Sequence, residues 1–182
     1  MNPILRLFKS IFKKINYDLR KIEQINLKKE FPEVTDFEKN LFEISSDYTM
    51  TSNERIFSLM KSIDFIRQNN VPGDFVECGV WRGGNLIIFQ KFIEKYNLNK
   101  KIYAYDTFEG MSKPEEIDKT FDGKSSIELL EKLNEKNVDR NNNILVADCS
   151  LEKVKENFKK FSSQENLICI KGKVEETLEK KE

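Results

Sequence analysis

Apolar side chains recur at helical spacing through the first third of the chain. Between residues 4 and 22 they step by three and four positions, which predicts a helix with one apolar stripe. The stripe consists of Ile4, Phe8, Ile11, Phe12, Ile15, Leu19 and Ile22. Basic residues flank the stripe, so the predicted helix is both basic and amphipathic. The same spacing predicts a short helix over residues 35–44 and a longer one over residues 51–70.

From residue 74 the pattern changes to short apolar runs that alternate with helical segments. The runs of strand length are residues 74–80, 101–108 and 166–172, and the helical segments are residues 83–96, 125–136, 150–161 and a helix starting at residue 174. This alternation predicts a parallel sheet with helices on its faces, joined by right-handed crossovers. The run 143–150 is also strand-like and competes for the third strand. We favour 166–172, because Gly172 and a new helix follow it.

The basic helix predicted over residues 4–22 has two interpretations. It can lie on an anionic membrane surface, or it can pack on its own domain or on a partner subunit. The stripe by itself does not discriminate between the two. We favour packing, and peripheral membrane contact is the alternative. No apolar run is long enough to span a membrane, and no export signal is recognisable, so we expect a cytoplasmic protein.

Composition removes several classes of function. Lysine plus arginine and aspartate plus glutamate both total 31, and this balance gives no support for a partner nucleic acid. The chain contains no histidine, which excludes a histidine-based hydrolase triad and histidine-ligated metal. The three cysteines show no C-x-x-C spacing, so reduced thiols are expected, with Cys78 and Cys169 as small core residues of strands.

Four of the seven glycines fall in the stretch "GDFVECGVWRGG", from Gly73 to Gly84. A glycine turn between a strand and a helix is typical of α/β proteins that hold nucleotide cofactors. Glu77 precedes this turn, and its charge would repel a pyrophosphate but attract an ammonium group. The stretch therefore favours S-adenosylmethionine, whose amino-acid tail is cationic, over a nicotinamide dinucleotide. We expect Trp81 to pack beneath the turn and not to touch the ligand.

Asp106 ends the second predicted strand, in "KIYAYDTF". An acid at this point of a strand-helix-strand unit can accept hydrogen bonds from both hydroxyls of a ribose. Glu77 and Asp106, each at the end of a strand in one unit, together predict a nucleotide cofactor more strongly than the glycines alone.

Four blocks in order resemble the macrocin O-methyltransferase family, the TylF/MycF-like class I methyltransferases: "YTMTSNERI", "GDFVECGVWRGGN", "KIYAYDTFEGM" and "KGKVEETL". The resemblance runs from Tyr48 to the C-terminus. It implies a Rossmann-like α/β fold, S-adenosylmethionine as cofactor, and O-methylation of a sugar hydroxyl with help from Mg²⁺. It also implies a small-molecule or glycan acceptor and association into a homo-oligomer. The implied organisation is a helical extension over residues 1–47 and a cofactor-binding domain over residues 48–182.

The resemblance also assigns cofactor contacts. The methionine part would meet Glu77 and Gly79, with Gly83 at the start of the following helix. The ribose would meet Asp106, with Thr107 and Phe108 beside it. The remaining contacts would be Gly172, Lys173 and Val174 on the adenine side, and Thr51 and Ser52 closing over the site.

The departure from the family concerns metal and catalysis. The family's metal ligands lie on an Asp-x-Asp block and a paired-Asp block after its fourth and fifth strands, and the sequence ends at Glu182 before either. No metal ligand and no general base can therefore be assigned in this chain. We expect the N-terminal part of a methyltransferase sheet with an open edge; the alternative is a non-catalytic cofactor- or partner-binding module.

Overall fold

The computed structural model describes residues 27–111, 113–135, 149–162 and 166–178. The basic helix predicted over residues 4–22 and most of the competing strand-like run lie outside the described residues. The chain divides into two compact units, with the boundary between Thr35 and Asp36. In the first unit, helix α2 (Leu27–Glu30) ends where the Phe31 amide donates to the Leu27 carbonyl at 2.7 Å. The predicted domain boundary at residue 48 stays a prediction.

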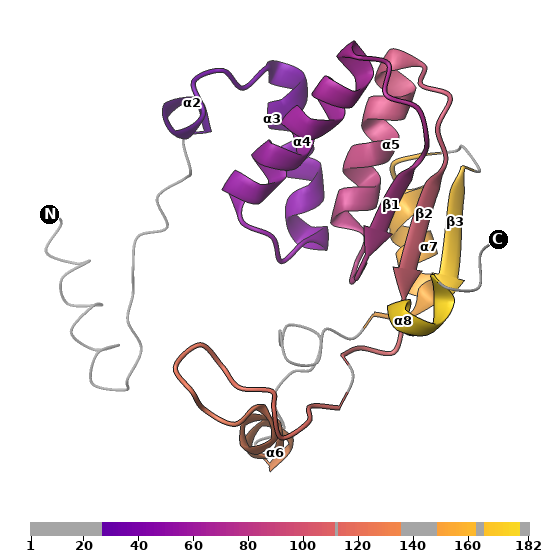
Figure 1. Cartoon of the computed structure of the whole chain (residues 1–182). Coiled ribbons are helices and arrows are strands. Elements are labelled where there is room, and N and C mark those ends of the chain that lie inside the picture. Colours follow the sequence, from indigo (N-terminus) through magenta and orange to yellow (C-terminus); the bar gives the residue numbers. More distant parts are fainter. Residues whose placement is uncertain (1–26, 112, 136–148, 163–165, 179–182) are drawn as a thin grey trace, which may run out of the picture. The chain divides into compact units, whose positions relative to one another are not determined.

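The second unit contains a three-stranded parallel sheet (Figure 1). Its strands are β1 (Phe75–Cys78), β2 (Ile102–Asp106) and β3 (Leu167–Lys171), in the order β1-β2-β3. In register, Phe75 of β1 pairs with Ile102 of β2, which pairs with Leu167 of β3. All three predicted strands and their parallel direction are confirmed. The run 166–172 forms the strand beside β2, and most of the competing run 143–150 lies outside the described residues.

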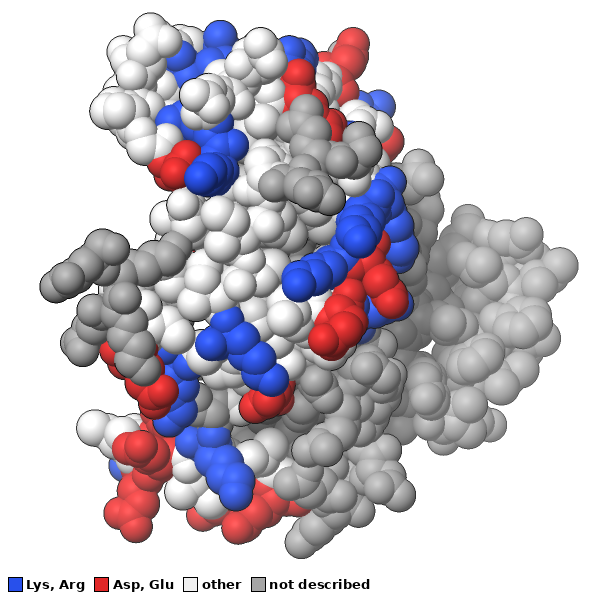
Figure 2. Space-filling view, turned by 90° about the vertical axis from the view of Figure 1, so that its right-hand side faces the viewer, with Lys and Arg blue, Asp and Glu red and all other residues white. Residues whose placement is uncertain are grey.

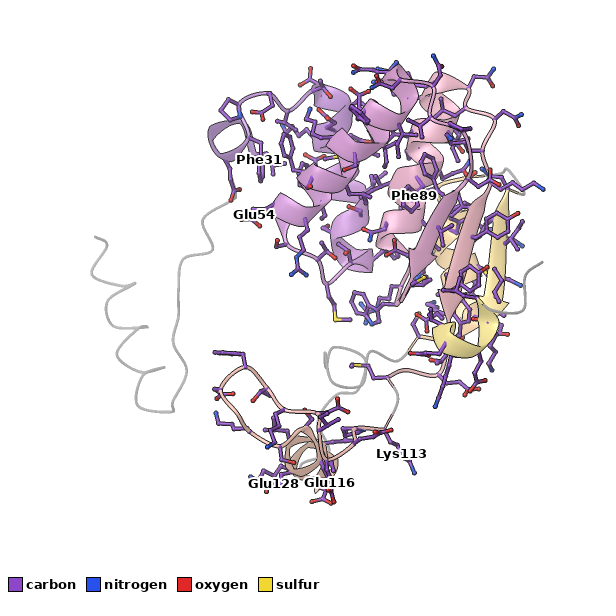
Figure 3. The ribbon with its side chains drawn as sticks, viewed as in Figure 1. Phe31, Glu54, Phe89, Lys113, Glu116 and Glu128 are labelled. Carbon is purple, nitrogen blue, oxygen red and sulfur yellow. The ribbon has the colours of Figure 1, made fainter. Side chains whose placement is uncertain are left out.

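Three helices lie side by side next to the sheet (Figure 1). They are α3 (Asp36–Ser45), α4 (Asn53–Gln68) and α5 (Gly84–Tyr96), and the 3-10 turn η1 (Ser46–Tyr48) follows α3. Helix α5 crosses over from β1 to β2, and most of its apolar side chains are buried. The ring of Phe89, a residue of α5, points toward β1 (Figure 3) and stacks on the ring of Phe75, with the ring centroids 4.7 Å apart. Burial of α5 therefore anchors the start of the sheet.

In the described residues of the connection from β2 to β3, two helices are present. Helix α6 (Ser126–Glu135) follows a turn in which Lys119 and Ser125 form an isolated antiparallel bridge. Ser150 caps the N-terminus of helix α7 (Leu151–Lys159), because its hydroxyl accepts from the Lys153 amide at 3.3 Å. The predicted cap of this helix is thus confirmed. A short helix, α8 (Val174–Thr177), follows β3.

Helix α7 reaches the turn that follows β1. Val154 and Phe158 are buried, and the Asn157 side-chain amide donates to the Arg82 carbonyl at 3.2 Å. A β-carbon on Gly83 would lie 3.5 Å from a methyl of Val154. The turn after β1 therefore rests on α7 as well as on α5.

The other face of the sheet is less covered. Side chains alternate between faces along a strand, and Val76 and Cys78 point away from Phe75 and its helix partner. Val76 is 52% exposed and Cys78 is exposed as well, so the prediction of Cys78 as a core residue is wrong. Cys169, on the opposite face, is half-buried. Figure 2, which views the molecule from the side where β3 lies in Figure 1, shows an area largely free of charged side chains.

Within the described residues, β1 pairs with β2 only, so its other edge has no strand partner. The sequence predicted an open sheet edge, and this arrangement fits it.

Candidate functional site

A cavity of about 340 Å³ lies where the three strands end. In a parallel sheet, the loops after the carboxyl ends of the strands are the usual place for a ligand. Its volume is within the range of small-molecule sites. The lining comes from four segments: Met50; Gly79 and Trp81 after β1; Asp106, Thr107, Gly110 and Met111 after β2; and Gly172, Lys173, Val174 and Glu175 after β3.

The turn after β1 has an unusual backbone. Gly79 and Gly83 have φ of +84° and +90°, which glycine adopts without steric cost. Trp81, between them, has φ of +49°, a left-handed conformation that a bulky residue rarely adopts. The Gly79 amide donates to the Tyr105 carbonyl at 2.9 Å, which extends the β1–β2 ladder up to the turn.

Asp106 connects the first two loops. Its Oδ2 accepts from the backbone amides of Val80 at 2.6 Å and Trp81 at 3.2 Å. Its Oδ1 accepts from the Phe108 amide at 2.8 Å. The carboxylate that we predicted to hold a ribose thus already holds the backbone of the two turns that line the cavity.

The loop after β2 closes on itself through Thr107. The Thr107 hydroxyl donates to the Gly110 carbonyl at 2.7 Å and accepts from the Glu109 amide at 3.3 Å. Phe108, between them, is 4% exposed and has a left-handed φ of +52°. Its buried ring anchors the loop, while Thr107 and Gly110 face the cavity.

The loop after β3 is tied to the same aspartate through the main chain. The Gly172 amide donates to the Asp106 carbonyl at 3.0 Å. Gly172 has φ of +142°, and a β-carbon there would lie 2.8 Å from a methyl of Thr177. Lys173 precedes α8, and its carbonyl accepts from the Thr177 amide at 3.0 Å. Glycine is therefore required where this loop turns into α8.

Glu77 lies on the α5 side of β1 and is half-buried. Burial raises the pKa of its carboxyl above the ordinary value, and a hydrogen bond from the Asn85 side chain opposes that rise. The Asn85 Nδ2 atom donates to Glu77 Oε1 at 2.7 Å. The Asn85 Oδ1 atom is buried and has no hydrogen-bond partner among the described residues. This pair presents desolvated acceptor atoms at the start of α5, which suits a cationic group.

The structure brings together six of the eleven predicted cofactor residues. Those in the cavity wall are Gly79, Asp106, Thr107, Gly172, Lys173 and Val174. Thr51, Ser52, Glu77, Gly83 and Phe108 do not line it. They flank it instead, as the residues before or within the same turns. All eleven predicted contacts with a cofactor stay predictions.

Two lining residues show what sequence reasoning missed. Trp81, expected to pack beneath the turn, is part of the cavity wall, and the Arg82 guanidinium lies 4.4 Å from the centre of its ring. Met50 lines the cavity from the segment before α4, where Thr51 and Ser52 had been expected. Gly84, the second glycine of the "GG" pair, was the feature of the sequence that could have indicated a close approach of this segment to α5. A β-carbon on Gly84 would lie 2.7 Å from the Thr49 β-carbon, so the segment that carries Met50 crosses α5 there.

Among the described residues, no three acidic or cysteine side chains are grouped so that they could hold a metal ion. No helix in the described part of the chain is long and apolar enough to cross a membrane.

Comparison with known proteins identifies the relatives of this chain. The macrocin-O-methyltransferase (TylF) family matches residues 10–182. Demethyldecarbamoylnovobiocin O-methyltransferase of Streptomyces niveus is 28% identical over 115 residues, which are 63% of this chain and 39% of that protein. An 8-demethyl-8-(2,3-dimethoxy-alpha-L-rhamnosyl)-tetracenomycin-C 4'-O-methyltransferase of Streptomyces olivaceus is 34% identical over 65 residues, or 35% of this chain and 25% of that one.

A solved structure shares the fold. The O-methyltransferase NovP superposes with a TM-score of 0.51 and 26% sequence identity, covering 69% of this chain and 47% of that one. The predicted α/β fold class is thereby confirmed. The chain spans less than half the length of each of these three relatives.

Proposed function

The chain belongs to the macrocin-O-methyltransferase (TylF) family, and we propose that it binds S-adenosylmethionine and supplies the cofactor-binding part of an O-methyltransferase. The acceptor we propose is a sugar hydroxyl of a small molecule or glycan. One observation carries the cofactor proposal: the loops after all three parallel strands meet at one cavity of about 340 Å³. The names of the two matched relatives, both O-methyltransferases, support the reaction type.

The residues at the strand ends fit this cofactor. Its cationic amino group would be held by the Glu77 carboxylate, which burial makes a strong partner for a positive charge. The glycine turn at Gly79 lets a ligand approach the backbone closely. Thr107 and Lys173 offer a hydroxyl and an ammonium in the cavity wall for the sugar and base. A pyrophosphate would meet Glu77 unfavourably, which disfavours a dinucleotide.

When bound, S-adenosylmethionine supplies a methyl group on a positively charged sulfur. This chain would contribute binding and orientation of the cofactor, because hydrogen bonds fix the turns around the cavity in the ligand-free structure. Holding the donor in one orientation is a large part of catalysis for a transfer that must proceed in line.

We also propose an oligomeric state and a location for the protein. Homo-oligomeric assembly and a cytoplasmic location are proposals that rest on the family resemblance. Peripheral membrane contact through the basic amphipathic helix predicted over residues 4–22 is the weaker proposal.

Calorimetric titration of the 182-residue chain with S-adenosylhomocysteine tests the cofactor proposal. We expect saturable binding, and a loss of affinity of about tenfold or more in Glu77→Gln, because a charged hydrogen bond becomes a neutral one. Glu43→Gln, at an exposed position of α3, is the matched control and should bind as the parent does. A chain that is folded by circular dichroism but gives no saturable heat would refute the proposal.

A further inference from the structure

One buried polar side chain of α7 has both of its polar atoms bonded to residues near the cavity. Asn157 is 2% exposed. Its Nδ2 atom donates to the Arg82 carbonyl at 3.2 Å, and its Oδ1 atom accepts from Lys160 Nζ at 3.2 Å. Only one orientation of the amide satisfies both contacts, because the carbonyl needs a donor and the ammonium needs an acceptor. A buried amide that is bonded at both ends can fix the position of the groups it contacts.

The first contact of Asn157 fixes the end of the turn after β1. Arg82 lies two residues before α5, and its carbonyl is the group that Asn157 holds. The Trp81 amide is held separately, because it donates to Asp106 Oδ2 at 3.2 Å. Trp81, which lines the cavity, therefore lies between two hydrogen-bonded anchors, one from β2 and one from α7.

The ring of Trp81 depends on these backbone anchors for its position. Its Nε1 atom is buried and has no hydrogen-bond partner among the described residues. The ring packs against the Arg82 guanidinium, 4.4 Å from the ring centre, and the Trp81 backbone has the uncommon left-handed φ of +49°. A shift of the peptide group at Arg82 would therefore move the ring in the cavity wall.

The second contact of Asn157 leads to the opposite side of the cavity. Lys160, which accompanies Asn157 at the end of α7, has its Nζ atom 3.4 Å from the Tyr48 hydroxyl oxygen. The Tyr48 ring also meets the Phe161 ring edge to face, with the ring centroids 5.5 Å apart. Tyr48 stands two residues before Met50, which lines the cavity. The end of α7 thus supports the segment that carries Met50.

We infer that Asn157 is a positioning residue of the cavity, which fixes Trp81 through the Arg82 carbonyl and supports the Met50 segment through Lys160. It does not line the cavity, and it acts on a ligand only through the residues that it holds. The inference rests on the proposed function where it concerns affinity for S-adenosylhomocysteine. Its effect on Trp81 can be measured without a ligand.

The first test uses Trp81, the only tryptophan of the chain, as a fluorescent reporter. In the ligand-free chain, Asn157→Leu should shift the Trp81 emission and make it more accessible to quenching by acrylamide, because the Arg82 carbonyl loses its donor. Phe158→Leu is the matched control: it removes buried apolar volume from the same helix and retains the Asn157 amide. Its emission and quenching should equal those of the parent while circular dichroism shows a folded chain. Equal quenching in Asn157→Leu and the parent would overturn the inference.

The second test is calorimetric titration of the same three chains with S-adenosylhomocysteine. Asn157→Leu should bind about fivefold more weakly or worse, the factor that corresponds to one lost hydrogen bond. Phe158→Leu should bind as the parent does, although both variants lose stability. Equal losses of affinity in the two variants would mean that α7 has a merely structural role, which overturns the inference. If the parent chain does not bind, the proposed function fails, and the quenching comparison still decides whether Asn157 positions Trp81.

The third test separates the two contacts of Asn157. Asn157→Asp has nearly the same shape, and its ionised carboxylate still accepts from Lys160 but cannot donate to the Arg82 carbonyl. It should change the Trp81 emission as Asn157→Leu does, and it replaces that variant if Asn157→Leu does not fold. An unchanged emission would overturn the inference.

Lys160→Met, at an exposed position, makes the opposite change. It retains the bond to Arg82 and removes the contact with Tyr48, so the Trp81 emission should stay as in the parent. Affinity for S-adenosylhomocysteine should fall by a smaller factor than in Asn157→Leu, because only the Met50 side of the cavity loses its support. An affinity equal to that of the parent would contradict the link between Asn157 and the Met50 segment.

Discussion

Helix α5 and the loops at the ends of the strands are stabilised in different ways, although the turn after β1 leads directly into α5. The helix is held by many apolar contacts, with Leu86, Ile87 and Ile88 fully buried. The loops are held by a few directional hydrogen bonds that converge on Asp106. Apolar packing spreads stability over many partners, whereas a hydrogen-bonded clamp fixes the shape of one place. Substitutions in α5 should therefore unfold the domain, and substitutions in the loops should reshape the cavity.

The largest effect is expected from the helix. Phe92 is 1% exposed and meets Phe37 of α3 edge to face, with centroids 5.2 Å apart. Phe92→Ala should lower the free energy of unfolding by about 3–5 kcal/mol, because it leaves a cavity between two helices. Urea denaturation followed by circular dichroism measures this.

Phe65→Ala is the matched control for that prediction. Phe65 of α4 is 63% exposed, so its removal should change stability by about 0.5 kcal/mol or less. Equal losses for the two phenylalanines would contradict the view that burial in the α5 layer is what matters.

The next effect is expected at the junction of the two regions. A β-carbon at Gly84 would lie 2.8 Å from the Tyr48 carbonyl oxygen, in addition to the Thr49 contact. Gly84→Ala should lower stability by about 1–3 kcal/mol and also weaken cofactor binding, because the displaced segment carries Met50 into the cavity wall. Thermal unfolding and titration with S-adenosylhomocysteine give the two numbers.

Gly73→Ala separates the clash from backbone strain. Gly73 has φ of +95°, and nothing lies within 4 Å of a β-carbon there. It should lower stability through strain alone and leave affinity unchanged. A loss of affinity as large as that of Gly84→Ala would argue against a specific role for the Tyr48–Met50 crossing.

A moderate effect of pH is expected from Glu77. Because burial raises its pKa in the folded chain, the folded state keeps a proton that the unfolded state has lost in the window between the two pKa values. Stability of the ligand-free chain should therefore fall as pH rises through that window. Affinity for S-adenosylhomocysteine should rise over the same window, because the ionised carboxylate attracts the ammonium group.

Titrations and denaturation curves across that window check both slopes, and Glu77→Gln should flatten both. An affinity that stays constant with pH in the parent chain would contradict the assignment of Glu77 to the amino group.

The smallest effect is expected at the rim of the loops. Lys171 Nζ lies 2.6 Å from Glu109 Oε1, and both side chains are exposed. The hydrogen bond with Glu109 raises the pKa of Lys171, but water and salt screen such a pair. Glu109→Gln should leave both the urea midpoint and the ligand affinity unchanged. A midpoint shift that disappears at high salt would show that the rim contributes more than we expect.

The sequence predicted the α/β alternation from local signals. Residues 74–80, 101–108 and 166–172 have strand length and apolar character, and glycines or polar residues bound them. Helices α4 and α5 were predicted from apolar spacing, and the structure buries Ile56, Met60 and other residues of those stripes. These elements depend on residues close in sequence, which is why a pattern can find them.

Side-chain burial was predicted less well, because it depends on what covers each face. Cys78 has the same apolar strand context as Cys169, and only the arrangement of helices around the sheet distinguishes the two. The contribution of Met50 likewise depends on a chain crossing between Gly84 and the residues Tyr48 and Thr49, which are distant from it in the sequence.

By itself, the sequence determined that a glycine turn and two acids would stand at the ends of parallel strands, and hence that a nucleotide cofactor was to be expected there. Only the tertiary structure decided which groups donate hydrogen bonds to the carboxylate oxygens of Asp106. The strand register brings Asp106 beside the turn after β1, where the amides of Val80 and Trp81 lie within hydrogen-bond distance. The position of Asp106 in the sequence does not reveal these donors, because they belong to a turn about 25 residues earlier that only folding brings near.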